Sequence, residues 1–114
     1  MQLHLPTWEM ALQGKDLVGV ELGIYRAESF CTLLQCVPNI KKLYGVDNWQ
    51  PYVDYIKDPY DGIPNGASTD REIEYSKFMA YHAIKYCANN HKAEVLEMDS
   101  TEAADKFDDE SLDF

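Results

Sequence analysis

The sequence lacks the features that would place a chain in a membrane or on a nucleic acid. None of its segments is a continuous apolar run of about 18 residues, the length that a membrane-spanning helix needs. The first residues also lack the charged and then apolar pattern of a signal peptide. Lys41 and Lys42 form the only adjacent basic pair, and the net charge is −10. We therefore expect neither nucleic acid nor a membrane surface as a partner, because both carry negative charge.

Cysteine and histidine are also scarce. The chain has three cysteines and three histidines, and it has no Cys-x-x-Cys pair. An odd number of cysteines without such a pair is typical neither of a disulfide framework nor of a zinc site. We interpret Cys31, Cys36 and Cys87 as small residues on helix faces rather than nucleophiles, and we expect no metal. A reduced, cytoplasmic setting is the default expectation.

What the chain does have is the composition of one globular domain. Hydrophobic residues make up 46% and charged residues 26% of the sequence, as in ordinary globular proteins. A chain of 114 residues is long enough for one core, and it lies near the lower end of length for a layered α/β fold. We therefore expect residues 1–114 to form a single domain.

The stretch Leu17–Phe30 has the pattern around which the rest of the chain is organised. Residues 17–20 are apolar and partly β-branched, which predicts a strand buried on both faces. After Gly23 the apolar residues recur with the period of a helix, which Pro38 ends. Leu43–Val46 predicts a second strand. Strand, helix and strand within about thirty residues indicate a right-handed βαβ unit.

Further elements are expected on both sides of this unit. Periodicity and turn residues predict a short helix within 1–14, a proline- and aromatic-rich loop over 48–67, a long helix over 69–89, a third strand over 93–98, a short helix over 100–107 and the opening of a fourth strand over 111–114. The long loop starts on the ligand side of the sheet. It can form a lid or pack on the domain surface, and the sequence leaves both open.

Each of the three predicted strands is followed by an acid. These residues are Glu21, Asp47 and Asp99. Ligands of parallel sheets bind at the carboxyl ends of the strands, so we expect the three carboxylates to line one crevice. Carboxylates accept hydrogen bonds from hydroxyls and amines, whereas a pyrophosphate would meet like charge there. The alternative interpretation is that these strand ends simply meet solvent.

The turn after the first strand contains a single glycine, Gly23. The G-x-G-x-x-G pattern of dinucleotide sites, which lets the backbone approach a pyrophosphate, is absent. Its absence disfavours a fragment of a nucleotide-dependent oxidoreductase. An adenosine ligand with a sulfonium and an amino-acid tail fits the three acids better.

At these positions the chain resembles the class I S-adenosylmethionine-dependent methyltransferases, in particular their small-molecule O-methyltransferase-like branch. Val20–Ser29 is similar to the first motif of that family. Leu43–Trp49 is similar to the second motif and Met98–Ala103 to the third. Phe107–Phe114 resembles the approach to the fourth strand of the family. The resemblance covers residues 15–114.

The resemblance implies how the chain would meet S-adenosylmethionine or S-adenosylhomocysteine. Glu21 and Gly23 would lie near the methionine part, and Tyr25 would also bind the cofactor. Asp47 would hold the ribose hydroxyls, and Asn48 or Trp49 would lie against the adenine. Asp99 would accept from the adenine amine, with the Ser100 N–H at the edge of the ring. Arg26 could pair with the cofactor carboxylate or with Glu28. The chain departs from the family at Ala27, where the family usually has glycine.

The fold implied by the resemblance is a three-layer, Rossmann-like α/β sandwich with a parallel sheet of strand order 3-2-1-4. The chain reaches only the start of the fourth strand, so we expect an incomplete, truncated cofactor-binding domain. In the family, later segments supply the acceptor pocket, the catalytic residues and any metal ligands. The catalytic residues and the methyl acceptor therefore stay unknown.

Two functions remain open. The first is a cofactor-binding domain that, in the complete family fold, transfers a methyl group to a small-molecule acceptor. The second is a non-catalytic remnant or association module of the same fold. The unpaired edge of a truncated sheet predicts a homodimer, or other self-association through that edge.

Overall fold

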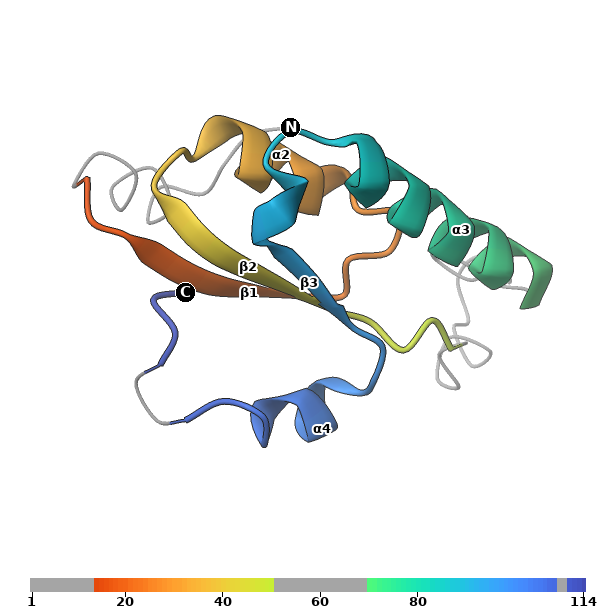
Figure 1. Ribbon diagram of the computed structural model, residues 1–114. Helices are drawn as coiled ribbons and strands as arrows, with labels where there is room; N and C mark the ends of the chain where they lie inside the picture. The colour runs from red at the N-terminus through yellow and green to blue at the C-terminus, as the bar shows by residue number, and fades with distance from the viewer. Residues whose placement is uncertain (1–13, 51–69, 109–110) are drawn as a thin grey trace, which may run out of the picture.

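The computed structural model describes residues 14–50, 70–108 and 111–114, and it contains a three-stranded parallel sheet. In space the strands follow the order β1 (Leu17–Leu22), β2 (Ile40–Val46) and β3 (Ala93–Leu96), and both pairs are parallel (Figure 1). A small α/β domain with a parallel sheet is therefore confirmed. The helix expected before residue 14 and most of the loop expected over 48–67 lie outside the described residues.

Helices cover the two faces of this sheet. The helices α2 (Glu28–Cys36) and α3 (Asp70–Tyr86) lie on one face, and the short α4 (Ser100–Ala104) lies on the other (Figure 1). A 3-10 turn, η2 (Asn90–Lys92), leads from α3 into β3. Among the described residues, no helix is both long enough and apolar enough to cross a membrane.

Several elements begin or end a few residues from their expected bounds. β2 begins at Ile40 rather than at Leu43, because Ile40 is already a buried core residue. β1 continues through Glu21 to Leu22, two residues beyond the expected strand. The helix α4 ends early, at Ala104. As a result, β2 is longer than expected, and Glu21, an expected site residue, lies within the sheet.

The main core lies between the sheet and the pair of helices α2 and α3. Phe30 and Leu34 of α2 are completely buried, and Ile73 and Ala80 of α3 belong to the same cluster. Helical spacing places these residues on one face of each helix. Gly45 of β2 lets α2 approach the sheet, because the Phe30 Cε2 atom lies only 2.8 Å from where a Cβ atom would stand.

The opposite face of the sheet carries more polar residues. Alternation along β2 turns Lys42 and Tyr44 away from the core. Lys42 forms an ion pair of 3.4 Å with Glu94 of β3. The Tyr44 ring meets the Phe107 ring edge to face, with centroids 4.9 Å apart. The segment that follows α4 therefore packs on this second face.

Residues 111–114 lie along the edge of β1 that β2 leaves free. The Asp113 N–H donates to the Val18 carbonyl over 2.6 Å, and the Val20 N–H donates to the Phe114 carbonyl over 3.0 Å. The Asp113 carboxylate also accepts from the Val18 N–H over 2.8 Å. These bonds do not form a regular ladder, so the segment expected to open a fourth strand is not a strand in this structure.

Replacing Gly45 with alanine should destabilise the domain by about 1–3 kcal/mol, because the added methyl group overlaps the buried Phe30 ring. Urea unfolding followed by circular dichroism measures the loss. Lys41→Ala is the control: Lys41 is exposed on the same strand, and its replacement should change the free energy of unfolding by less than about 0.5 kcal/mol. Unchanged stability of Gly45→Ala would contradict this packing.

Candidate functional site

In the part of the chain that the structure describes, two cavities open at the carboxyl ends of the strands. The larger, which we call the strand-end cavity, has a volume of about 380 Å³ and is lined by Leu22, Gly23, Val46, Asp47, Asn48, Met98, Asp99, Ser100 and Thr101. The smaller, which we call the turn cavity, has a volume of about 240 Å³ and is lined by Gly23, Ile24, Tyr25, Arg26, Glu28 and Ser29. Gly23 belongs to both linings, so the two cavities adjoin each other.

The turn between β1 and α2 has an unusual backbone. Gly23, Tyr25 and Ala27 have φ angles of +77°, +51° and +66°, in the left-handed region that favours glycine. For Tyr25 and Ala27 this conformation costs about 1–2 kcal/mol each. Trp49, in the turn after β2, has a φ of +46°. Because strained backbone conformations of this kind are concentrated at functional sites, these two turns are candidates for part of such a site.

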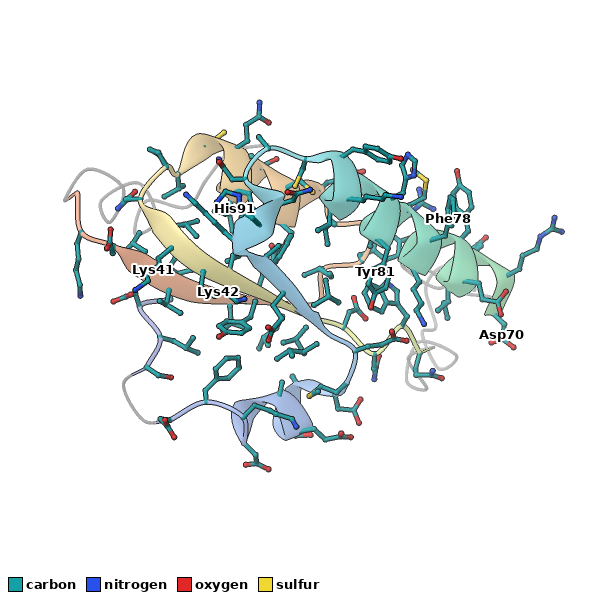
Figure 2. All side chains as sticks on the ribbon, in the orientation of Figure 1. Lys41, Lys42, Asp70, Phe78, Tyr81 and His91 are labelled. Carbon is teal, nitrogen blue, oxygen red and sulfur yellow. The ribbon has the colours of Figure 1, made fainter. Side chains whose placement is uncertain are left out.

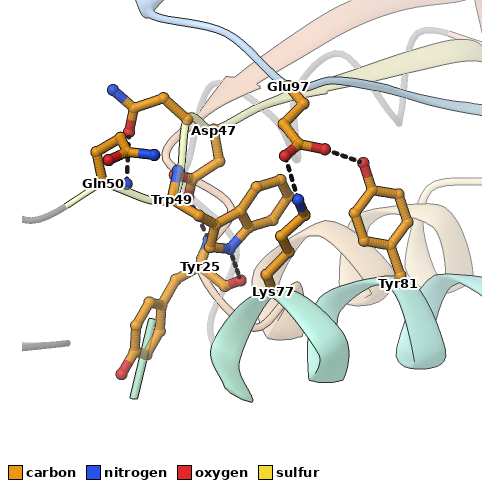
Figure 3. A network of polar contacts seen from close by, with 8 residues as sticks. Tyr25, Asp47, Trp49, Gln50, Lys77, Tyr81 and Glu97 are labelled. Atoms are coloured by element: carbon orange, nitrogen blue, oxygen red, sulfur yellow. Dashed lines mark hydrogen bonds and ion pairs between the residues drawn. The ribbon is translucent and has the colours of Figure 1, made fainter. Parts of the chain in front are cut away.

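Asp47 follows β2 directly, as expected, and it joins the two turns. Its Oδ2 atom accepts from the Tyr25 N–H over 2.9 Å, and its Oδ1 atom accepts from the Trp49 N–H over 2.8 Å (Figure 3). A carboxylate has about four sites at which it can accept a hydrogen bond. Asp47 can therefore support both turns and still accept from a ligand in the strand-end cavity that it lines.

Asn48 and Asp99 also line the strand-end cavity. The Asn48 Nδ2 atom donates to the Asp99 Oδ1 atom, and the Asn48 Oδ1 atom accepts from the Gln50 N–H over 3.1 Å. Asp99 does not follow β3 directly as expected, because the ladder with β2 ends at the pair Val46 and Leu96. Asp99 instead stands at the N-cap of α4, whose first residue, Ser100, lines the same cavity.

Trp49 lies outside both cavity linings, although either Asn48 or Trp49 was expected beside the adenine. Its side chain is only 6% exposed, and its ring centroid lies 5.6 Å from that of Tyr81 on α3. The Trp49 Nε1 atom donates to the Tyr25 carbonyl over 2.9 Å. A buried indole with its one donor satisfied is stable in a core. Of the two candidates, Asn48 is the one at the cavity.

Glu21 also lies outside both cavity linings. It sits inside β1, and alternation along the strand gives it the same face as Leu17, which packs in the core beneath α2. Its Oε2 atom is buried and has no hydrogen-bond partner among the described residues. Burial raises the pKa of Glu21 above its ordinary value of 4.5, and the Ser29 hydroxyl offsets part of this rise.

The structure contains a polar network beside α3 that the sequence does not predict. Glu97, just after β3, accepts from the Lys77 ammonium and from the Tyr81 hydroxyl, the latter over 3.1 Å (Figure 3). The bond from Lys77 lowers the pKa of Glu97, whereas burial raises the pKa of Tyr81. Since these residues lie on segments far apart in the sequence, no local pattern could have predicted the network. It fixes the end of β3 to the helix that supports Trp49.

Arg26 has a hydrogen-bond partner that the sequence does not predict. Its Nε atom donates to the Ser76 hydroxyl on α3 over 3.3 Å. Its guanidinium carbon lies 5.2 Å from the centroid of the Tyr25 ring and 5.5 Å from that of Tyr75. Arg26 also lines the turn cavity. The residue thus joins the strained turn to α3 and places a positive charge beside that cavity.

The surroundings of Cys31 do not favour nucleophilic chemistry. Burial, together with the neighbouring Cys87 thiol and the Glu21 carboxylate, raises the pKa of Cys31 to about 12. A thiol with so high a pKa is protonated near neutral pH and reacts poorly. Within the described ranges, no group of three or more histidine, cysteine, aspartate or glutamate residues is placed to hold a metal ion.

No family model, no curated protein and no solved structure matches the chain. The chemistry of the site is therefore inferred from its own residues and geometry. The donor and acceptor groups around the strand-end cavity are Asp47, Asn48, Asp99 and the start of α4. These groups accept from hydroxyls and amines and can donate to a ring nitrogen.

Asp47→Ala should lower the free energy of unfolding by about 2 kcal/mol even without a ligand, because two backbone N–H groups lose a charged acceptor. Asp99→Ala is the comparison: its carboxylate is exposed and accepts one side-chain hydrogen bond, so the loss should stay below about 1 kcal/mol. Thermal and urea unfolding measure both variants. Equal losses would contradict the structural role of Asp47.

Glu21→Gln should stabilise the domain at neutral pH. Because the pKa of Glu21 is raised in the folded state, the native carboxyl favours folding below its ordinary value of 4.5 and opposes folding once it is ionised. The advantage of the glutamine variant should therefore appear as the pH rises above 4.5 and persist at pH 7. Melting temperatures measured between acidic and neutral pH test this.

Glu97→Gln should show the opposite trend and serves as the control. The pKa of Glu97 is lowered in the folded state, so its carboxylate stabilises the protein above the ordinary value of 4.5, and this is lost as the pH falls through the folded pKa. The loss in Glu97→Gln at pH 7 should stay below about 1 kcal/mol, because the pair with Lys77 is largely exposed. Parallel pH profiles for the two variants would contradict the assignment.

Proposed function

We propose that this domain binds S-adenosylmethionine and is the cofactor-binding part of a methyltransferase that acts on a small-molecule acceptor. The observation that carries the proposal is the strand-end cavity, where Asp47, Asn48 and Asp99 meet at the carboxyl ends of a parallel sheet. Parallel sheets bind their ligands at this edge. The cavity volume of about 380 Å³ lies within the range of small-molecule sites, about 300–1,000 Å³.

The polar groups of the strand-end cavity suit an adenosine. The Asp47 carboxylate can accept from the two ribose hydroxyls while it holds its two backbone N–H groups. Asp99 can accept from the exocyclic amine of adenine, and the Ser100 N–H can donate to the ring. Two carboxylates at one cavity disfavour a ligand with phosphate groups, because like charges would meet with little water between them.

The turn cavity suits the amino-acid end of the same ligand. It adjoins the strand-end cavity at Gly23, so one elongated molecule can reach both. Arg26 offers a positive charge for a carboxylate, and Glu28 offers a negative charge for an ammonium group. Tyr25 lines the same cavity. These groups support a ligand that carries an adenosine at one end and an amino acid at the other.

When bound, S-adenosylmethionine supplies an electrophilic methyl group. The residues proposed here hold the two ends of the cofactor. Holding two reactants in the correct relative position can provide a large part of the rate enhancement of a group transfer between them. The strained turn at Tyr25 and Ala27 is consistent with a backbone shaped around a ligand rather than for stability. We assign no catalytic residue and no acceptor.

The bonds between β1 and residues 111–114 support a fourth strand at this edge. They run in the parallel sense, because Val18 meets Asp113 and Val20 meets Phe114. Continued as a strand, the segment would extend the sheet to the order 3-2-1-4. Two chains would then associate through the part of the β1 edge that this segment does not cover.

The proposal also includes the cytoplasmic location that is expected from the sequence.

The second candidate function, an association module of the same fold without catalysis, is favoured by a different observation. Tyr75, Phe78 and Tyr86 of α3 each expose more than half of their surface, at 54%, 63% and 70%. None of them lines either of the two cavities. Exposed aromatic side chains in a row are typical of a contact surface rather than of a cofactor site.

Isothermal titration calorimetry with S-adenosylhomocysteine on the 114-residue chain tests the cofactor proposal. Thr101→Trp should weaken binding by at least about tenfold, because the indole would fill the strand-end cavity that Thr101 lines. Glu102→Trp is the matched control. Glu102 is the next residue on α4, is exposed and lies outside the lining, so this variant should keep the original affinity.

Two results would count against the proposal. Absence of binding by the unchanged chain would remove the cofactor function. Equal affinities of the Thr101→Trp and Glu102→Trp variants would place the ligand outside the strand-end cavity. Asp47→Ala is not used for this purpose, because loss of the Asp47 carboxylate disturbs both turns before any ligand binds.

A further inference from the structure

The outward face of α3 carries a row of aromatic rings. Tyr75, Phe78, His82 and Tyr86 follow one another at intervals of three, four and four residues, the spacing of one helix face. Tyr75, Phe78 and Tyr86 are mostly exposed, and His82 is exposed as well. We call these four residues the aromatic stripe. It lies on a helix whose other face already packs in the core.

Three of the four rings of the aromatic stripe contact one another along the helix. The Phe78 and His82 rings stack with centroids 5.9 Å apart, and the His82 and Tyr86 rings lie 4.9 Å apart. Phe78 lies on the side of α3 away from the sheet, whereas Tyr81 lies on the side toward it (Figure 2). Contiguous exposed apolar surface of this kind marks an interaction site.

We propose that the aromatic stripe is the contact surface between two copies of this chain, whose α3 helices pack antiparallel about a two-fold axis. The stripe is nearly symmetric about position 80. Phe78 and His82 lie two residues before and after it, and Tyr75 and Tyr86 lie five before and six after it. In an antiparallel pair, Phe78 therefore meets the partner's His82, and Tyr75 meets the partner's Tyr86.

The charges beside the stripe favour a second copy as its occupant. Glu74 and Lys85 directly precede Tyr75 and Tyr86, and both are exposed. They are eleven residues apart, just over three full turns, so they lie on the same flank of the stripe. A two-fold axis in the plane of the interface keeps each flank on its own side. Glu74 thus meets the partner's Lys85, twice in each dimer, which makes the surface complementary to itself.

This interface is separate from the sheet edge and, apart from the contact of Tyr75 with Arg26, from the two cavities. The edge of β1 is occupied at Val18 and Val20 by residues 113–114, and none of the stripe residues lines the strand-end cavity or the turn cavity. Each exposed ring adds on the order of 100 Å² to a contact, whereas a standard interface buries about 800 Å² on each partner. We therefore expect a weak dimer that forms as the concentration rises.

Sedimentation velocity on the 114-residue chain, from low micromolar to millimolar concentration, tests the proposal. The weight-average sedimentation coefficient of the unchanged chain should rise from the monomer toward the dimer value. Phe78→Glu should abolish the rise, because it places a charge in the apolar contact. Circular dichroism should show the same helix content for this variant, since Phe78 is exposed and does not belong to the core cluster of the described residues.

A charge exchange separates this geometry from other contacts. Glu74→Lys alone and Lys85→Glu alone should each weaken dimerisation by at least about tenfold, because like charges would meet twice per dimer. The double variant should restore the original dimerisation constant. Within one helix the two charges lie about 16 Å apart, so they interact little there, and the restoration reports a contact between subunits.

Three outcomes would overturn the proposal. A chain that stays monomeric at every concentration has no such interface. A dimer that survives Phe78→Glu forms through another surface, such as the sheet edge. A dimer that is lost in Phe78→Glu but is not restored by the double charge exchange uses the stripe in a different orientation or with a different occupant.

Discussion

The Asp47 carboxylate, which accepts a backbone N–H from each of two turns, is the interaction on which the site depends. Tyr25 belongs to the turn after β1, and Trp49 belongs to the turn after β2. Both residues have positive φ angles, which are unfavourable for residues other than glycine unless the surrounding structure holds them. Hydrogen bonds to a charged acceptor are stronger than those between neutral groups, so one carboxylate can hold both strained turns. The two cavities open beside the turns that it joins.

The support for these turns continues into α3. The Trp49 indole donates to the Tyr25 carbonyl and packs against Tyr81, whose hydroxyl bonds to Glu97 at the end of β3. From the first turn, Arg26 also reaches α3, at Ser76. The helix thus has two separate roles on two faces. Its inner face supports the proposed cofactor site, and its outer face carries the aromatic stripe that we propose to join two chains.

The βαβ unit and the position of Asp47 could be predicted, because their signals act over a few neighbouring residues. Apolar runs, one glycine and a helical period are enough to place them. The face of the sheet on which Glu21 lies could not be predicted, because it depends on how far β1 continues to pair with β2. The ladder continues to the pair Leu22 and Val46, and this draws Glu21 into the strand and onto the core face. The sequence allows Trp49 as an adenine contact, because no residue near Trp49 in the sequence indicates that its ring packs against Tyr81.

By itself, the sequence determined the succession of strands and helices along the chain, the single-glycine turn and the acid that directly follows β2. Local periodicity and turn chemistry carry that information. Only the tertiary structure decided which polar residues share a cavity, because that depends on strand register and on contacts between distant segments. Asn48 and Asp99, bonded across 51 positions of the chain, are one example. The exposed aromatic face of α3 is another, since the sequence of a helix does not show which of its apolar faces is buried until the neighbouring elements are in place.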